Sequence, residues 1–279
     1  MSAAGQLRDA TNRLQAAGCP SAAVDARLLL AHVLASTPDR LALNPVVTPA
    51  QAAIFDAMVA RRAAGEPVQY LTGTAYFRHE TLGVGPGVFI PRPETEGLVQ
   101  LVLDRLAMSR LSNPLVVDLG TGSGAIALAL AHEAPGARVV AVERSDAALQ
   151  FARRNLAGSG VELRAGDWRE AVDDLAAAVD VVVSNPPYVP TAARQALPVD
   201  VVDPPEALFA GGDGLDALRE IAPVAARLLR PGGYLACEHD DTHGASAAAV
   251  VEATGDFTDV ADHRDLTGRA RYVTAGRRP

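Results

Sequence analysis

The chain has 279 residues, 49% of them hydrophobic and 4% aromatic, which is enough apolar material for a large and mainly aliphatic core. Its 25 basic and 33 acidic residues give a formal net charge of −8, so no overall positive potential attracts the protein to a nucleic-acid backbone. This charge argues mildly against a nucleic-acid substrate, and the length predicts two domains.

Cysteine content and hydropathy exclude two further classes of protein. Cys19 and Cys237 lie far apart in sequence and do not suggest a disulfide framework. The N-terminus has no signal-like apolar stretch, and nowhere do about 18 apolar residues run together. We therefore expect a cytoplasmic protein with no membrane partner.

The first 69 residues have the pattern of a small helical domain. Apolar residues recur at helical spacing over residues 7–17, and Ser21 is placed to cap a second helix. Residues 48–51, Thr-Pro-Ala-Gln, have the form of a capping box at the start of a third helix. The segment contains no cluster of acids, histidines or cysteines, so a catalytic role is not indicated.

Residues 70–93 are dense in glycine and proline and lose the helical period. Short β segments at 75–77 and 88–90 fit between these breaks and predict a β-hairpin that joins the two domains. Residues 94–108 then predict a helix that leads into a second domain, residues 94–279.

The second domain alternates strands with helices. We predict strands over residues 115–119, 138–143, 161–165, 179–183, 233–238, 257–261 and 270–275. This alternation predicts an α/β fold with a Rossmann-like, doubly wound and mostly parallel sheet.

Ligand-type loops follow three of these strands. Gly120-Thr121-Gly122-Ser123-Gly124 lies between a strand and a helix, where glycines let a nucleotide-like ligand approach the backbone. Glu143 ends the next strand, where an acid in such folds accepts hydrogen bonds from ribose hydroxyls. Asp167 and Trp168 follow the third strand and suit an adenine amino group and ring. Either acid alone is typical of a solvated loop, but the order of all three loops favours a shared site.

The motif Asn185-Pro186-Pro187-Tyr188 follows the buried-strand pattern at 179–183. Asn185 offers a side-chain carbonyl, and the prolines have no N–H, so the segment presents mainly acceptors. Such a site can bind both hydrogens of an NH2 group, with Tyr188 as an apolar wall. An Asn-Pro dipeptide by itself is typical of a simple turn; the glycine loop upstream favours the functional interpretation.

Together these motifs carry a family resemblance. The chain reads DLGTGSG at 118–124, GDW at 166–168 and NPPY at 185–188, with FIPRPETE at 89–96 and FAGGDGLD at 209–216. In this order the motifs resemble those of the release-factor glutamine methyltransferases, the HemK/PrmC family, over nearly all 279 residues. The Val202–Pro205 stretch departs from the Glu-Pro that the family more usually has there.

The resemblance implies a protein-(glutamine-N5) methyltransferase that depends on S-adenosylmethionine. Its acceptor would be the glutamine of the Gly-Gly-Gln motif in class-1 peptide chain release factors, with residues 1–69 docking the factor and no stable nucleic-acid partner. The implied catalytic residues are Asn185, Pro186 and Tyr188, and Pro187 joins them in substrate binding. The implied cofactor-binding residues are Asp118, Gly120, Thr121, Gly122, Ser123, Gly124, Glu143, Asp167, Trp168, Asn185, Phe89 and Arg92. For Phe89 and Arg92, a core aromatic and a solvated arginine remain equally open.

Other functions share parts of this pattern. An adenine-N6 or other amino-group nucleic-acid methyltransferase would also explain NPPY, but residues 1–70 contain six arginines and five acids and form no basic recognition domain. A NAD-dependent dehydrogenase would explain the glycine loop and leave NPPY unexplained. The intact NPPY also speaks against a catalytically silent scaffold that only binds S-adenosylmethionine.

A dense cluster of acids and histidines follows the predicted strand at 233–238. Nothing else in the sequence completes a metal-ligand geometry around residues 239–243, so we expect no metal. We expect Glu238 to face the site, by resemblance to the family. The role of the Glu238–His243 cluster, the oligomeric state, the set of factors modified and the binding order stay open.

Overall fold

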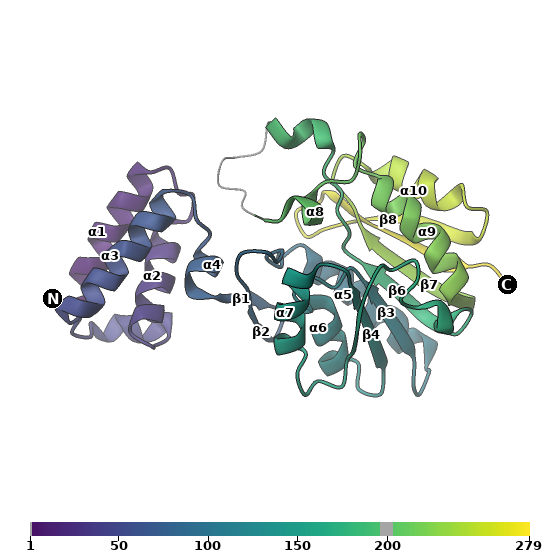
Figure 1. The fold of residues 1–279 in the computed structure, drawn as a ribbon, viewed down its shortest axis with the longest axis horizontal. Coiled ribbons are helices and arrows are strands. Elements are labelled where there is room, and N and C mark those ends of the chain that lie inside the picture. Colours follow the sequence, from purple (N-terminus) through teal and green to yellow (C-terminus); the bar gives the residue numbers. More distant parts are fainter. Residues whose placement is uncertain (1, 196–202) are drawn as a thin grey trace. The chain divides into compact units, whose positions relative to one another are not determined.

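The computed structural model describes residues 2–195 and 203–279, and the chain divides into two compact units (Figure 1). The first unit ends at Thr74, and the second begins at Ala75 and includes Asp203–Pro279. In the part of the chain that is described, no helix is both long and apolar enough to cross a membrane.

The first unit is helical. Its elements are α1 (Ala3–Ala16), α2 (Ala22–Val33), the 3-10 turn η1 (Pro38–Leu43), α3 (Pro49–Ala63) and α4 (Val68–Thr72). Their apolar faces enclose one core around Leu14, Leu29 and Phe55. This core is what lets short helices persist, because isolated helices of this length are marginal in water.

The two predicted caps of this unit have different outcomes. The capping box at α3 is confirmed: the Gln51 amide donates to Thr48 Oγ1 at 3.3 Å, and the Thr48 amide donates to Gln51 Oε1 at 3.0 Å. Ser21 precedes α2 but does not cap it, because its hydroxyl donates to Asp25 Oδ1 at 2.8 Å. The buried Asp25 in turn accepts from Arg62 Nε at 2.8 Å, so the serine is hydrogen-bonded to one member of an ion pair.

A two-stranded hairpin opens the second unit, but its second strand is not the predicted one. The strands are β1 (Thr74–Phe77) and β2 (Glu80–Gly83). The prediction of a strand at 88–90 was wrong: the Val88 amide donates to Gly85 O in a turn, and the Ile90 amide donates to the Asp203 side chain. A carboxylate acceptor from far along the chain replaced the expected strand partner.

The second unit contains the predicted doubly wound sheet, with strand order β5-β4-β3-β6-β7-β9-β8. Its strands are β3 (Leu115–Leu119), β4 (Arg138–Glu143), β5 (Glu162–Ala165), β6 (Val179–Ser184), β7 (Leu229–Glu238), β8 (Phe257–Arg264) and β9 (Ala270–Arg277). Strands β3 to β7 pair in parallel, and β9 runs antiparallel to both β7 and β8. The Rossmann-like fold class is confirmed.

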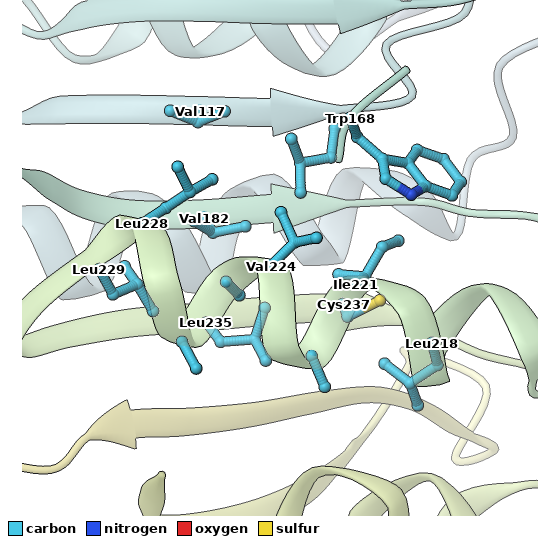
Figure 2. Packing of buried hydrophobic residues seen from close by; sticks show 14 of the residues in the cluster. Val117, Trp168, Val182, Leu218, Ile221, Val224, Leu228, Leu229, Leu235 and Cys237 are labelled. Atoms are coloured by element: carbon cyan, nitrogen blue, oxygen red, sulfur yellow. The ribbon is translucent and has the colours of Figure 1, made fainter. Parts of the chain in front are cut away.

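Helices cover both faces of this sheet. Its helices are α5 (Thr95–Ser109), α6 (Ala125–Glu133), α7 (Asp146–Asn155), α8 (Pro205–Leu208), α9 (Asp216–Leu228) and α10 (Gly244–Glu252), with 3-10 turns η2 (Asp173–Leu175) and η3 (Thr191–Gln195). Alternate strand residues supply the two cores: Val116 and Val181 pack with α5 and α6, while Val117 and Val182 pack with α9. Figure 2 shows Ile221 and Val224 of α9 in the second of these cores.

Replacing Thr48 by alanine should lower the free energy of unfolding by about 1 kcal/mol, because α3 loses the acceptor for one of its free N–H groups. Thr37 is a matched control: it precedes η1 in the same extended conformation but makes no capping hydrogen bond, so Thr37→Ala should cost less than about 0.5 kcal/mol. Urea unfolding followed by circular dichroism measures both. Equal losses in the two variants would show that the capping bond contributes nothing.

Candidate active site

The predicted ligand loops lie at the carboxyl ends of neighbouring strands. β3 is flanked by β4 on one side and β6 on the other, so the chain leaves β3 at a point where the strand order reverses. Such switch points are where open α/β sheets bind ligands. Ser184 Oγ donates to Leu119 O at 2.6 Å and connects the ends of β6 and β3 directly.

The glycine loop after β3 needs its glycines. Gly120, Gly122 and Gly124 have φ values of 76°, 58° and 89°, in the left-handed region. A Cβ on Gly120 would lie 3.3 Å from the Trp168 ring, and one on Gly124 would lie 2.9 Å from the Leu156 side chain. The loop therefore packs closely against the segments that follow β5 and α7.

Glu143 holds two loops together. Its Oε2 accepts from the Gly122 amide, and its Oε1 accepts from the amides of Arg144 and Ser145, each at 2.8 Å. Glu143 is only 8% exposed. A carboxylate offers about four acceptor positions, so three backbone bonds leave one for a ligand.

Asp118 lies beneath the same loop and is fully buried. Its Oδ2 accepts from Thr121 Oγ1 at 2.6 Å, whereas its Oδ1 has no hydrogen-bond partner in the described structure. Burial raises the pKa of Asp118 to about 7, and the nearby Glu143 charge adds to this rise. A cation placed at Oδ1 would reverse the cost of burying this carboxyl.

Asp167 and Trp168 form the far side of the loop. Arg169 donates to both oxygens of Asp167 at 2.8 Å, and these bonds lower the pKa of Asp167 to about 2. Trp168 lies in the core under α9 and is 7% exposed, and its Nε1 has no acceptor among residues 2–195 and 203–279. Arg144 lies over its ring at 5.5 Å. An adenine amino group at Asp167 would have to share the carboxylate with Arg169.

Asn185 is oriented by a residue that the sequence analysis did not single out. Its Nδ2 donates to Thr95 Oγ1 at 3.0 Å. Thr95, at the start of α5, is buried. Because the NH2 group of the carboxamide faces Thr95, its carbonyl oxygen faces away from Thr95.

Tyr188 is more than an apolar wall. Its hydroxyl donates to Glu238 Oε1 at 3.1 Å, and burial together with the Glu238 charge raises the pKa of Tyr188 well above its usual value. Burial also raises the pKa of Glu238 to about 7, against the opposing effect of hydrogen bonds from Thr95 and Tyr188. The structure thus brings Asn185, Thr95, Tyr188 and Glu238 into one cluster.

The FAGGDGLD segment supports the backbone that leaves this cluster. The Val189 amide donates to Leu208 O at 2.7 Å, and the Ala210 amide donates to Val189 O at 3.0 Å. Gly214, with φ 80°, lies so close that a Cβ there would be 2.3 Å from Tyr188 O.

Phe89 and Arg92 form a separate pair in the structure. Arg92 lies over the Phe89 ring at 5.0 Å and makes an ion pair with Asp203, whose other oxygen accepts from the Ile90 amide at 3.1 Å. These contacts fix the segment that leads into α5 and Thr95. The sequence offered no signal for Asp203 beyond its departure from the family's usual residues.

His239, directly after β7, has its own partners. His239 is buried, with Nδ1 2.8 Å from Asp240 O and Nε2 3.0 Å from Asp262 Oδ1. Over residues 2–195 and 203–279, no group of three or more His, Cys, Asp or Glu side chains is placed to bind a metal ion. The pair of His239 and Asp262 links the end of β7 to β8.

Gly214→Ala should lower the free energy of unfolding by about 1–3 kcal/mol, because its Cβ meets the Tyr188 carbonyl and its φ is positive. Gly212 lies in the same loop, and a Cβ there would meet nothing within 4 Å, so Gly212→Ala is the control, with a change under about 0.5 kcal/mol. Chemical denaturation of both variants tests the close approach. A Gly214→Ala protein as stable as the control would disprove it.

Asp118→Asn should stabilise the ligand-free protein at high pH. The pKa of Asp118 rises from 3.8 to about 7 on folding. The stability that its protonated carboxyl contributes to the folded protein is therefore fully present below pH 3.8 and is lost as pH rises through about 7. At pH 8 the variant should exceed wild type by on the order of 2 to 4 kcal/mol, and at pH 4 the two should agree.

Unfolding free energies measured across this pH range test the Asp118 prediction. Glu252→Gln, at an exposed acid on α10, is the control and should show no such pH-dependent gain. A constant difference between Asp118→Asn and wild type at all pH values would contradict the burial effect.

Two family models match the chain: a PrmC N-terminal domain over residues 6–73 and a methyltransferase small domain over residues 85–213. The chain is 47% identical over 276 residues to a release factor glutamine methyltransferase of Streptomyces coelicolor, covering 97% of this chain and 96% of the relative. It is 48% identical over 273 residues to that of Mycolicibacterium smegmatis, with the same 97% and 96% covered.

Two further proteins are also similar to this chain. A 4-amino-L-phenylalanine/4-methylamino-L-phenylalanine methyltransferase of Streptomyces pristinaespiralis is 43% identical over 257 residues, covering 89% of this chain and 87% of the relative. The solved hMettl16 catalytic domain, in complex with MAT2A 3′UTR hairpin 6, has a TM-score of 0.58 at 15% identity over 89% of this chain and 92% of that chain, which shows a shared fold alone. Identity above 45% to the relatives from S. coelicolor and M. smegmatis, over nearly the whole length, shows that the chain belongs to the release factor glutamine methyltransferase family.

Proposed function

We propose that this protein transfers a methyl group from S-adenosylmethionine to the side-chain amide nitrogen of the glutamine in the Gly-Gly-Gln motif of class-1 peptide chain release factors. The observation that carries the proposal is the fixed Asn185 carboxamide beside the glycine loop, in a chain of this family. The Thr95 bond leaves the Asn185 carbonyl as an acceptor for an incoming NH2 group.

The residues around the glycine loop suit a cationic adenosine ligand. Asp118 Oδ1 and Trp168 Nε1 are buried polar atoms without a partner in the described structure, and Glu143 keeps one acceptor position. Asp118, Glu143 and Asp167 place three carboxylates around the loop, which disfavours the pyrophosphate of NAD. We assign the ribose to Glu143 and the adenine to Asp167 and Trp168, with Gly120 allowing the close approach.

The methyl donor supplies an electrophilic carbon whose bond to sulfur breaks with the electron pair leaving on sulfur. The protein's task lies on the acceptor side, because a carboxamide nitrogen is a poor nucleophile whose electron pair is delocalised. Asn185 Oδ1 and the Pro186 carbonyl accept both N–H groups and orient that pair toward the methyl carbon. As the nitrogen gains positive charge, these dipoles stabilise the transition state more than the ground state. The transfer makes the remaining N–H acidic, and the nitrogen then loses one proton to solvent.

We further propose distinct roles for the parts of the chain. Residues 1–69 form the docking domain for the release factor, residues 70–93 the linker, and residues 94–279 the catalytic domain. The helical core of the first unit and the doubly wound sheet of the second support this division. Phe89 and Arg92 then shape the segment that positions Thr95.

Mass spectrometry of a purified class-1 release factor, incubated with the enzyme and S-adenosylmethionine, tests the assignment. We expect one methyl group on the glutamine of the Gly-Gly-Gln peptide and none on a factor in which that glutamine is replaced by alanine. Duplex DNA and free 4-amino-L-phenylalanine serve as competing acceptors, the second because of the relative from S. pristinaespiralis. Faster transfer to either competitor would overturn the proposal.

Asn185→Ala should lower the rate of methyl transfer on the order of 10²- to 10³-fold, as loss of one preorganised polar group typically does. Affinity for S-adenosylmethionine should change little, because the glycine loop and Glu143 are untouched. Single-turnover kinetics with saturating release factor measure the rate, and calorimetry measures the affinity. A variant within about threefold of wild type, under roughly 0.7 kcal/mol, would remove Asn185 from the mechanism.

A further inference from the structure

A buried row of polar groups lies behind Asn185. Asn185 Nδ2 donates to Thr95 Oγ1 at 3.0 Å, and Thr95 is 3% exposed. A hydroxyl has one proton, and the bond from Asn185 occupies a lone pair, so the Thr95 proton is free to point elsewhere. The direction of that proton decides whether Thr95 acts as an acceptor toward Asn185.

Glu238 is the group that faces Thr95. It ends β7, is 1% exposed, and accepts from the Tyr188 hydroxyl at 3.1 Å through Oε1. Its Oε2 is buried and has no hydrogen-bond partner among the described residues, and the Thr95 hydroxyl is one of the groups that lower the pKa of the carboxyl. An ionised Glu238 only accepts, so it draws the Thr95 proton toward itself.

Charges on every neighbouring element act on this carboxyl. Arg271 on β9 favours its ionised form and Glu94, before α5, disfavours it, while the adjacent Cys237 lies in the core. Burial and the Glu238 charge raise the pKa of Tyr272 on β9. The Tyr272 hydroxyl donates to Glu94 O. The group is therefore embedded in a fixed set of partners.

We propose that Glu238 is a positioning residue for methyl transfer: as a carboxylate it accepts the Thr95 proton, which makes Thr95 an acceptor for Asn185 Nδ2 and turns Asn185 Oδ1 toward the substrate amide. This inference rests on the proposed function. In this proposal, Glu238 and Thr95 determine whether Asn185 presents an acceptor or a donor to the substrate. A residue that only packs in the core would not have this role.

Protonation of Glu238 reverses the direction of the hydrogen bonds between Glu238, Thr95 and Asn185. A protonated carboxyl donates to Thr95, whose own proton then turns to Asn185 and favours the flipped carboxamide, with Nδ2 toward the substrate. Two donors, Asn185 Nδ2 and the substrate N–H, then oppose each other. Because burial raises the pKa of Glu238 to about 7, transfer should be fast above this pH and fall below it.

The test compares wild type with Glu238→Gln, Thr95→Val and Thr95→Ser in single-turnover transfer to a release factor, from pH 5.5 to 8.5. Saturating S-adenosylmethionine separates the effect from Asp118, which titrates in the same range but acts on cofactor binding. The wild-type rate should fall about tenfold per pH unit below about 7. Glu238→Gln should be independent of pH and about 10- to 100-fold slower at pH 8, with cofactor affinity within about twofold.

The threonine variants distinguish the proposed hydrogen-bond role from a general structural effect of replacing Glu238. Thr95→Val keeps the shape without the hydroxyl and should be slow and independent of pH, while Thr95→Ser should restore both the rate and its pH dependence. In the ligand-free protein, the side-chain NH2 resonances of Asn185 should shift with the same midpoint in wild type and stay constant in Glu238→Gln.

The outcomes separate this inference from the proposed function. A wild-type protein that leaves the release factor unmodified refutes the function and, with it, the positioning role. A wild-type protein that methylates the factor, while Thr95→Val matches it or Glu238→Gln keeps the fall at low pH, refutes the positioning role alone. Asn185 resonances that do not respond to pH in wild type also refute it.

Discussion

The cofactor half of the site depends on the three backbone hydrogen bonds that Glu143 accepts. The amides of Gly122, Arg144 and Ser145 leave two different strand ends and would be unpaired without this carboxylate. Because the bonds are charge-assisted, the bond to Gly122 ties the left-handed glycine loop firmly to the segment that follows β4. In the function proposed above, the same residue that positions the loop also supplies an acceptor to the ligand, so stability and binding would depend on one side chain.

The acceptor half is organised by hydrogen bonds between elements that are far apart in sequence. Asn185 follows β6, Thr95 begins α5 and Glu238 ends β7, and these three residues meet behind the carboxyl ends of the strands. β6 and β7 are neighbours in the sheet, which brings Glu238 near the end of β6, and the packing of α5 on the sheet brings Thr95 there. A single amide orientation, and therefore the polarity of the site, results from this arrangement.

The two halves differ in the charge they prefer. Around the glycine loop, Asp118 and Glu143 are buried acids that favour a positively charged ligand. Around Asn185, the acceptors are neutral carbonyl dipoles, with the charge of Glu238 one residue further back. Such a division suits a reaction in which positive charge passes from a bound sulfonium to an acceptor nitrogen.

Local sequence determined the regular elements and the position of the ligand loops. β3 and β4 begin and end at the predicted residues, because runs of buried β-branched residues between polar or glycine breaks leave little choice of conformation. The Thr48 capping box formed for the same reason, since both partners lie within one turn. The glycine loop and NPPY were found at strand ends, where the sheet class alone requires them.

Only the tertiary structure decided which polar groups pair. Ile90 donates to Asp203 in place of a strand partner, and Asp25, which accepts from Ser21, also accepts from Arg62 of α3. Thr95 could not be placed at Asn185 from sequence, and for Glu238 only the family resemblance indicated that it faces the site, because the meeting of these residues depends on how α5 and β7 pack and not on any local period. A buried donor or acceptor takes the partner that the folded chain brings within about 3 Å, and sequence separation has no part in that choice.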